Sequence, residues 1–457
     1  MTNFNYAKKF VGEKALQQTL NYLAKNPEQN IPKLASLLKQ IAINREHKEK
    51  IEVLLQSYNQ NSNTRKYINR ILTENNPYVR QKIVINYVIN NSLMGVPRRK
   101  QKIEELGVNI PFTILIDPTS ACNLRCEGCW AGAQTKHDTL SFELLDRILT
   151  EAKELGIYWI TMSGGEPFAY PHLFEIAKKH NDMAFMIYTN GTLINDEVAD
   201  KIVELGNIAP AISLEGWKEQ TDARRGEGVF DKVVSAMDRL HSRGVLFGVS
   251  LTMTRENYKE VTSDEFIEFL INKGAIYGWS FHYIPIGRNP NLDLMLTAEQ
   301  RAYLINRVRH LRTHKPFMLM DFWNDGEHVT PKGCIAGGRT YFHITPSGKV
   351  TPCAFAQFTC DNIKEKSLLD VLKSPLFAAY QKRQPFCKNH LRPCPIIDNP
   401  DALKEIVKES GAHPLYPGAD AIISEDTNVF LNKKAKEWAE VSNPIWDKKV
   451  KKSEAIK

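Results

Sequence analysis

The sequence predicts an α/β fold: a partial (β/α)6 barrel with a helical domain before it and a small Cys-rich domain after it. Over the middle of the 457-residue chain, short β-rich runs alternate strictly with helical runs. Before this part, apolar residues recur at helical spacing, and after it the chain is rich in Gly, Pro and Cys. Hydrophobic residues make up 42% and charged residues 25%, which is ordinary for a globular protein.

The middle part, residues 108–315, contains the strand–helix alternation. The expected strands are Phe112–Asp117, Tyr158–Met162, Ala184–Tyr188, Ala209–Leu214, Leu246–Met253 and Tyr277–Ile284. The expected helices are Phe142–Leu155, His172–His180, Asp196–Leu205, Phe230–Arg243, Ser263–Lys273 and Ala298–Thr313. Such alternation indicates a parallel sheet covered by helices. Six units are too few for a closed eight-stranded barrel, so they suit an open TIM-type barrel with its reactive groups at the carboxyl ends of the strands.

The flanking parts predict three further regions. Residues 1–107 predict a helical domain, and the Pro-Arg-Arg-Lys run at Pro97–Lys100 predicts a linker into the barrel. Residues 316–400 predict a small domain that metal ligation would help to hold, with a hairpin at Tyr341–Val350. Residues 401–457 predict a polar tail with a helix near Asn432–Val441. The helices expected in the N-terminal domain are Ala15–Ala24, Ile31–Ile43, Lys48–Ser57 and Val79–Ile89.

The net charge of +8 is concentrated at the N-terminal end. Residues 1–110 carry 18 Lys and Arg against 8 Asp and Glu, and the rest of the chain is slightly acidic. This excess could favour an anionic membrane surface, an anionic lipid or a nucleic acid, or it could be a solvated helical face. The sequence has no apolar run of membrane-spanning length and no secretory signal at its start. We therefore expect a cytoplasmic protein. We expect no nucleic acid partner, and peripheral membrane contact through the basic N-terminal region stays open.

Three of the eight cysteines, Cys122, Cys126 and Cys129, fall within eight residues directly after the first expected strand. In a cytosolic chain such a cluster is typical of metal or Fe–S ligands rather than disulfides. The spacings of four and three let one loop direct three thiolates at one cluster, which leaves one of four irons open to a reacting molecule. The alternative is a zinc knuckle that takes its fourth ligand from elsewhere in the chain.

The segment CNLRCEGC resembles the CxxxCxxC loop of radical S-adenosylmethionine (SAM) enzymes, and the resemblance covers about residues 110–400. It implies that the three thiolates hold a [4Fe–4S] cluster whose open iron binds the amine and carboxylate of SAM. It also implies reductive cleavage of SAM to a 5′-deoxyadenosyl radical that abstracts hydrogen from a substrate. One departure concerns the adenine: the family often has an aromatic residue before the third cysteine, whereas this chain has Gly128 there and Trp130 just after the cysteine.

Further motifs follow the expected strands in the order typical of this family. After the second strand, a GGEP-like motif resembles the one that binds the methionyl amine of SAM; it consists of Gly164, Gly165, Glu166 and Pro167. Asn190 follows the third strand in a TNG-like turn, and Ser213 and Glu215 end the fourth, where the family contacts the ribose and methionyl groups. Arg225 resembles the arginine that reaches the SAM carboxylate. Ile286 follows the sixth strand in a loose GxIxG-like adenine contact.

A second cysteine group lies in residues 316–400. Cys334, a glycine-turned hairpin and Cys353 resemble the opening of SPASM and twitch extensions, which bind auxiliary [4Fe–4S] clusters. Five cysteines cannot ligate two cubanes through thiolates alone, so we expect one auxiliary cluster. The expected ligands are Cys334, Cys353, Cys387 and Cys394, with Cys360 and His390 as alternatives for the fourth. A structural zinc site is the alternative for the whole group.

The resemblance implies a radical SAM enzyme that receives electrons from a small flavodoxin- or ferredoxin-type donor. Peptide or protein modification is the first hypothesis for its unidentified substrate, because many SPASM and twitch enzymes act on peptides. Radical modification of lipid chains at a membrane surface is the second hypothesis, and a non-catalytic Fe–S electron carrier is the alternative from another class. Candidate substrate residues are His282, Tyr283 and the aromatic and acidic stretch Asp321–Glu327, which could instead be a loop packed by its own aromatic side chains.

Overall fold

Parallel strands form the centre of the molecule. The computed structural model describes residues 3–41, 45–134, 137–327 and 333–454. Within these residues the seven neighbouring parallel strands are β1 (Thr113–Ile116), β2 (Trp159–Met162), β3 (Ala184–Thr189), β4 (Ile208–Leu214), β5 (Gly248–Met253), β6 (Tyr277–His282) and β7 (Met318–Asp321). The first six are the predicted strands, and the predicted α/β fold class is confirmed. β7 is an addition, because a run of four residues carries no clear alternating signal.

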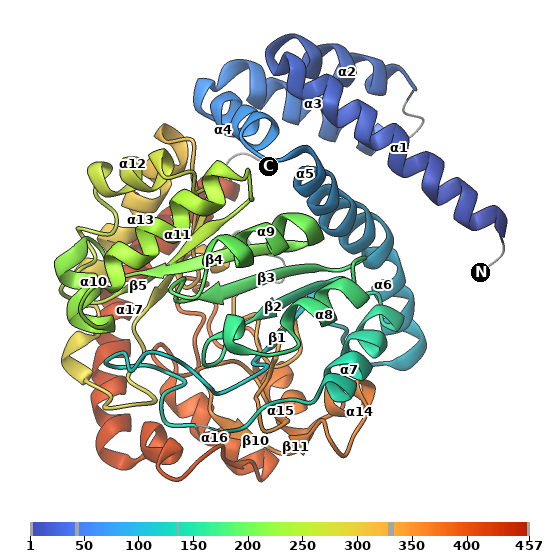
Figure 1. Cartoon of the computed structure of the whole chain (residues 1–457). Helices are drawn as coiled ribbons and strands as arrows, with labels where there is room; N and C mark the ends of the chain where they lie inside the picture. Colours follow the sequence, from blue (N-terminus) through green and yellow to red (C-terminus); the bar gives the residue numbers. More distant parts are fainter. Residues whose placement is uncertain (1–2, 42–44, 135–136, 328–332, 455–457) are drawn as a thin grey trace.

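Helices cover the outside of this sheet, as Figure 1 shows. They are α7 (Phe142–Glu154), α8 (Leu173–Lys179), α9 (Asp196–Leu205), α10 (Lys218–Arg225), α11 (Val229–Ser242), α12 (Asp264–Asn272) and α13 (Ala298–His314). Four of them begin after an N-cap whose side-chain oxygen accepts a backbone N–H of the first turn; these caps are Ser141, Asn195, Ser263 and Thr297. All but the short α10 were expected within a few residues. The buried faces of sheet and helices form one hydrophobic core.

The Cys-rich region continues the same sheet. The predicted hairpin is present as β8 (His343–Ile344) and β9 (Lys349–Thr351), which pair antiparallel. β8 also pairs parallel with β1, with Leu115 opposite His343, so the hairpin closes the β1 edge of the barrel sheet. β11 (Asp361–Asn362) adds a last short strand beside β9.

The chain after residue 365 is largely helical. Its elements are α14 (Leu368–Leu372), α15 (Pro375–Arg383), α16 (Pro400–Ser410) and α17 (Glu425–Glu454), with β10 (Phe358–Thr359) pairing antiparallel with β12 (His413–Pro414). The helix expected at Asn432–Val441 lies inside the much longer α17. α17 is not a loose polar tail, because its buried Trp438 packs against Ala298 and Ile305 of α13. The guanidinium of Arg301 also lies 4.3 Å from the centre of the Trp438 ring.

The N-terminal region is helical, as predicted, and lies above the barrel in Figure 1. Its elements are α1 (Asn3–Lys25), α2 (Pro27–Ile41), α3 (Arg45–Gln60), α4 (Ser62–Thr73), α5 (Pro77–Ile83), the π-helix η1 (Val84–Met94) and α6 (Gly95–Leu106). The predicted linker at Pro97–Lys100 is wrong, because these residues lie inside α6. Pro97 is the third residue of α6, and the π-helix η1 leads directly into this helix. Buried Arg99 anchors this helix by donating to the carbonyl oxygen of Gly156.

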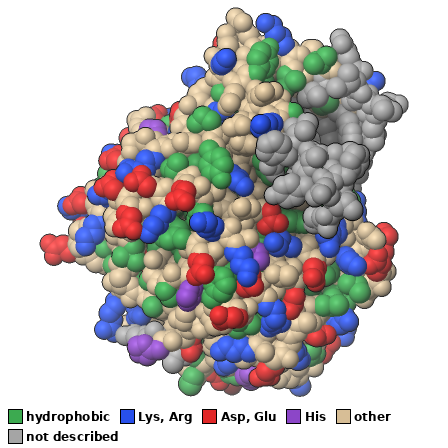
Figure 2. Space-filling model, turned by 45° about the vertical axis from the view of Figure 1, so that its right-hand side comes forward, with side chains coloured by type: hydrophobic (Ala, Val, Ile, Leu, Met, Phe, Trp, Pro, Cys, Tyr) green, Lys and Arg blue, Asp and Glu red, His purple; other side chains and the backbone are tan. Residues whose placement is uncertain are grey.

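Some of the excess basic residues in the N-terminal region have a structural role. Arg70 is buried and donates to the carbonyl oxygens of Ile271, Ala275 and Pro316 in the barrel, and Arg80 donates to Leu72 within the helical region. On the face drawn in Figure 2, Lys and Arg side chains are interspersed with Asp and Glu. Among the described helices, none has both the length and the apolar composition that a bilayer crossing requires.

Candidate active site

The motifs singled out in the sequence meet at one edge of the barrel. β1 to β6 are parallel, so their carboxyl ends lie on the same side of the sheet. The segment Cys122–Cys129, here called the triad loop, follows β1, and the other motif residues follow β2, β3, β4 and β6. Side chains from the later strand ends contact the triad loop directly, as described below. The barrel therefore holds this loop from several sides.

The triad loop presents its three thiols toward an accessible region. Cys122 is exposed and Cys126 and Cys129 are partly buried. The backbone N–H of Leu124 donates to Cys122 Sγ at 3.4 Å. Desolvation raises the pKa values of Cys122 and Cys126, and the nearby Arg225 guanidinium opposes that shift at Cys126. A bound metal cluster would favour the thiolates, which are the ligand form.

The GGEP-like motif packs tightly against the triad loop. A Cβ on Gly165 would lie 2.2 Å from the carbonyl oxygen of Ala121, so only glycine fits at this crossing of two backbones. The Glu166 N–H donates to the same oxygen at 2.8 Å. Gly164 has a φ of +108°, and its Cβ would lie 2.8 Å from that of Asp117. These contacts fix the entry to the triad loop against the end of β2.

The buried carboxylate of Glu166 joins the ends of β2 and β3. It accepts hydrogen bonds from the Thr189 hydroxyl at 2.7 Å and from the N–H groups of Asn190 and Phe168. Burial raises its pKa, although these three hydrogen bonds favour the charged form. The 3-10 turn that begins at Pro167 follows directly. Glu166 thus orders the Asn190 turn.

Asn190 links the third strand end to the triad loop. Its Nδ2 donates to Asn123 Oδ1 at 2.8 Å and lies 3.9 Å from Cys122 Sγ. Its Oδ1 accepts from the Thr192 backbone and hydroxyl. The Asn190 amide is therefore held rigidly beside the first cysteine. Asn123 gave no signal in the sequence, because it has no counterpart in the CxxxCxxC pattern.

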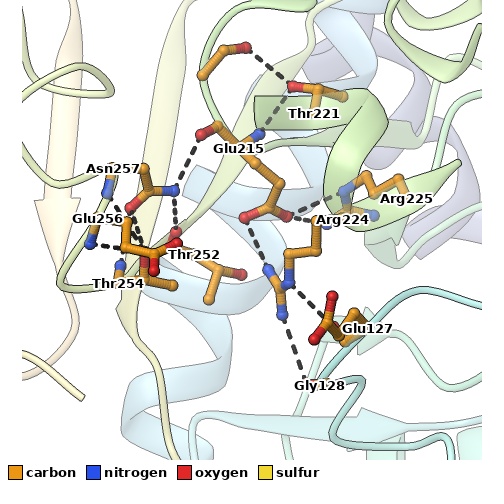
Figure 3. Close-up of polar contacts among 11 residues, drawn as sticks. Glu127, Gly128, Glu215, Thr221, Arg224, Arg225, Thr252, Thr254, Glu256 and Asn257 are labelled. Atoms are coloured by element: carbon orange, nitrogen blue, oxygen red, sulfur yellow. Dashed lines mark hydrogen bonds and ion pairs between the residues drawn. The ribbon is translucent and has the colours of Figure 1, made fainter. Parts of the chain in front are cut away.

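Glu215 at the end of β4 lies between two arginines of α10, as Figure 3 shows. Arg225 donates to Glu215 Oε1 through Nε at 2.9 Å and Nη2 at 2.5 Å, and Arg224 forms an ion pair with Oε2 at 2.7 Å. Only 1% of the Glu215 side chain is exposed, so this carboxylate depends on its partners. Two of the three guanidinium nitrogens of Arg225 therefore donate to Glu215. Ser213 lies within β4, two residues before Glu215, and is partly exposed.

Arg224 extends this charge network to the triad loop. Its Nε donates to the carbonyl oxygen of Glu127 at 3.2 Å, and the Glu127 N–H donates back to the Arg224 carbonyl at 2.9 Å (Figure 3). Asn257 supports the other side of Glu215 by donating to its backbone oxygen at 2.9 Å. Arg224 matched the family motif less closely than Arg225, yet it is the arginine that contacts the loop backbone.

The end of β6 covers the third cysteine. Arg288 donates through its backbone N–H to the Cys129 carbonyl at 3.0 Å, and a Cβ on Gly287 would lie 2.2 Å from that same oxygen. Ile286, the predicted adenine contact, is buried beside them. The turn after β6 and the end of the triad loop therefore pack closely, and there is no room for a side chain at Gly287.

The missing aromatic residue at position 128 has a structural counterpart. Gly128 has a φ of +59°, and a Cβ placed there would lie 2.9 Å from Cε2 of Tyr283, which follows β6. The Tyr283 ring thus occupies the space beside Gly128, and its hydroxyl accepts from the Asn291 N–H. Trp130 turns elsewhere and makes edge contacts with His343 and Phe355. An aromatic ring therefore lies beside the third cysteine, but it comes from the sixth strand end.

A cavity of about 50 Å³ lies between the end of β7 and the C-terminal region, and we call it the auxiliary cavity. Three of the predicted auxiliary ligands, Cys334, Cys353 and Cys394, line it. Burial raises the pKa of each thiol to about 12, so all three are protonated in the metal-free protein and must lose protons to bind iron. The aromatic side chains in its wall are Phe322, Trp323, Tyr341, Phe355 and Tyr380.

The other candidates for the fourth auxiliary ligand lie outside the lining of this cavity. Cys387 accepts a hydrogen bond from Arg392 at 3.7 Å, and Cys360 donates to the carbonyl oxygen of Ser410 at 3.6 Å. His390 packs against the Trp446 ring. Within the described ranges, no three side chains of His, Cys, Asp or Glu are placed to share a single metal ion.

The weaker substrate candidates are largely buried. Asp321 and His282 are each exposed by 2% or less, with Asp321 Oδ1 3.4 Å from His282 Nε2. The neighbouring His282 lowers the Asp321 pKa against the opposing effect of burial. His282 also stacks on Trp323 at 5.3 Å. Phe322 and Trp323 of this stretch form a wall of the auxiliary cavity, and their rings also pack on each other, as in the alternative of a loop packed by its own aromatic side chains.

One buried pair was missed in the sequence. Asp117 at the end of β1 lies 2.8 Å from His343 Nε2 of β8, and both side chains are buried. The other ring nitrogen of His343 lies 3.0 Å from the Thr351 hydroxyl. This pair links the strand that precedes the triad loop to the hairpin that carries Cys353. An Asp and a His separated by more than 200 residues carry no local signal of such pairing.

Comparisons with known proteins agree with this geometry. A model of the Radical SAM superfamily matches residues 116–267, and a model of the SPASM iron-sulfur cluster-binding domain matches residues 334–395. The AdoMet-dependent heme synthase of Methanosarcina barkeri is 25% identical over 291 residues, covering 58% of this chain and 82% of that protein. The mycofactocin maturase MftC of Mycolicibacterium smegmatis is 29% identical over 287 residues, covering 60% of this chain and 72% of that protein.

The fold also matches solved structures. SuiB of Streptococcus suis, bound to S-adenosylmethionine, superposes with a TM-score of 0.54 over 83% of this chain and 87% of that one, at 16% sequence identity. At this identity the likeness concerns the fold alone.

Both cysteine groups suit the cofactors of the matched domains. The triad loop offers three thiols and no fourth cysteine, which fits a cluster that keeps one iron open. The auxiliary cavity offers three more thiols within an apolar wall, where the buried hydroxyl of Tyr380 has no partner among the described residues. These donor sets fit Fe–S clusters.

Proposed function

Because the chain belongs to the radical SAM superfamily and carries a SPASM domain, we propose that it is a radical enzyme that modifies a peptide or protein. When bound, the cluster and SAM supply an electron and a 5′-deoxyadenosyl radical, which removes a hydrogen atom from the substrate. Cys122, Cys126 and Cys129 are the proposed ligands of that cluster. The observation that carries the proposal is the set of contacts through which the ends of β2, β3, β4 and β6 hold the triad loop.

The proposed SAM contacts surround this loop. Gly164, Gly165 and Pro167 form the backbone turn beside Cys122, and Glu166 orders that turn. Asn190 and Ser213 offer polar groups at the next two strand ends, and Ile286 offers an apolar surface beyond them. Glu215 holds Arg225 and Arg224, and these two positive charges suit the SAM carboxylate. A small flavodoxin- or ferredoxin-type protein is the proposed electron donor, since the exposed Cys122 side of the loop is open to a partner.

The activity is tested by product analysis. The anaerobically reconstituted protein, given dithionite and SAM, should release 5′-deoxyadenosine, and the C126A variant should release none. If the wild type contains an intact cluster and still releases no 5′-deoxyadenosine, the enzymatic proposal fails.

The substrate class can be tested without knowing the substrate. The peptide hypothesis has support from the maturase among the relatives. The lipid hypothesis rests on the basic N-terminal region, where Arg70, Arg80 and Arg99 are buried in contacts with carbonyl oxygens. Incubation with a deuterium-labelled peptide fraction should transfer deuterium into 5′-deoxyadenosine, and a labelled lipid fraction should not. Transfer from the lipid fraction alone would replace the peptide hypothesis.

A further inference from the structure

The auxiliary cavity provides three cysteines for a cluster that has four irons. Cys334, Cys353 and Cys394 all line the cavity, so one compact group could bind three of the irons. Cys387 is not among the lining residues, and its sulfur contacts Arg392. The cysteines in the cavity therefore leave one iron without a thiolate ligand.

Two tyrosines reach the same cavity, and their hydroxyl groups differ. The hydroxyl of Tyr341 is not among the buried polar groups that lack a partner in the described part of the chain. Tyr380 is fully buried, and its hydroxyl has no hydrogen-bond partner among the described residues. The buried hydroxyl of Tyr170 also lacks a partner among the described residues, but only Tyr380 of the two lines the cavity with the three cysteines. A bound group in this cavity would supply the contact that the Tyr380 hydroxyl lacks.

The Tyr380 ring is held in a fixed orientation. It lies on α15, a Cβ on Gly337 would come within 2.8 Å of its own Cβ, and the Phe386 ring packs edge-on at 5.6 Å. Tyr380 and the three cysteines Cys334, Cys353 and Cys394 line one and the same cavity. Tyr380 therefore belongs to the same group of side chains as the three cysteines.

We propose that the phenolate oxygen of Tyr380 is the fourth ligand of the auxiliary cluster, and that Cys387 is not a ligand. This inference rests on the proposed function, because it takes the auxiliary cluster to be of the four-iron type. Tyrosine oxygen ligates iron in other proteins, and a non-cysteine ligand changes the potential of an Fe–S cluster. Binding forms an Fe–O bond, and the phenol proton leaves to the buffer with the three thiol protons. No electron is transferred in this step.

The test isolates the auxiliary cluster in the C122A/C126A/C129A triple variant of the full chain. After anaerobic reconstitution this variant should keep about four irons per chain. Resonance Raman excitation in the visible absorption should enhance tyrosinate ring modes. Adding Y380F should abolish these modes and alter the Mössbauer spectrum of one iron site, whereas Y341F is the matched control and should retain the modes. C387A should retain both the iron and the modes.

Each outcome decides the matter. Loss of auxiliary iron in C387A, with an unchanged spectrum in Y380F, would overturn the inference and restore the four-cysteine ligand set. Absence of tyrosinate modes in the triple variant would also overturn it while leaving the proposed function intact. A triple variant with no iron at all would overturn both the four-iron auxiliary cluster and the inference. The enzymatic proposal would then be decided separately, by whether the wild type produces 5′-deoxyadenosine.

Discussion

The triad loop and the auxiliary cavity each present three cysteines, but the protein surrounds them differently. Cys122 is exposed, and the triad loop is held by Asn190 through the Asn123 side chain and by Arg224 and Arg288 through its backbone. The auxiliary cysteines lie within an aromatic wall, and burial raises their pKa values to about 12. Polar support leaves the first group accessible, as a site that must admit SAM, a substrate and an electron donor requires. The second group is more enclosed, because Cys353 is buried and Cys334 and Cys394 are partly buried among apolar side chains.

The largest expected difference between the two groups is in thiol reactivity. In the metal-free protein, iodoacetamide should alkylate Cys122 at least about a hundredfold faster than Cys353, because the thiolate is the reacting form. Raising a thiol pKa disfavours the thiolate, so with a pKa of about 12 only about one Cys353 in a thousand is ionised at pH 9. Its alkylation rate should therefore rise about tenfold per pH unit toward pH 12. Peptide mapping by mass spectrometry measures both rates; equal rates would mean that the auxiliary cavity opens in solution.

The polar support of the triad loop can be broken at Glu215. Glu215→Ala leaves two largely buried arginine charges without their carboxylate, which should cost about 3 kcal/mol of unfolding free energy. It should also lower iron incorporation into the triad loop, because Arg224 then loses its anchor. Urea unfolding of the metal-free protein and iron analysis measure the two effects. Asp231→Ala removes the exposed pair with Lys218 and should change neither; similar losses in both variants would contradict the role of Glu215.

A smaller effect is expected where two backbones cross beside the triad loop. Gly165→Ala places a Cβ against the Ala121 carbonyl oxygen, which should cost about 1–3 kcal/mol and shift the loop. Gly418→Ala is the control, because its Cβ would meet nothing within 4 Å and only its positive φ disfavours alanine. SAM binding to the reconstituted proteins, measured by calorimetry, should weaken only in Gly165→Ala. Unchanged binding would show that the loop tolerates the displacement.

Much of the barrel could be predicted from the sequence because its signals are local. Apolar periodicity indicated the helix positions, and glycine turns after β2 and β6 marked strand ends; the structure adds N-caps such as Ser141 and Asn195. The spacing of the triad alone indicated a metal site, and the ordered motifs at the strand ends pointed to a radical SAM enzyme. Its neighbours at the strand ends followed from the order of the motifs, and the structure brings Asn190 and Arg224 into contact with the loop.

The remaining features depend on contacts between distant segments. Pro97 predicted a linker, but tertiary contacts of Arg99 keep this segment helical. The ring beside Gly128 comes from Tyr283, more than 150 residues later, so the motif itself lacked it. Tyr380 carried no signal because a tyrosine within an amphipathic helix is usually a packing residue, and only the cavity distinguishes its hydroxyl.

The pairing of β8 with β1 has a consequence for how this chain can be divided. An exposed strand edge is a template for pairing with other chains, and here the hairpin covers the edge that β1 would otherwise present. A truncated protein that ends before residue 334 would keep the triad loop but uncover that edge and lose the His343 partner of Asp117. Such a fragment should self-associate. The part of the chain that carries the triad loop therefore cannot be produced cleanly without the part that carries the auxiliary cavity.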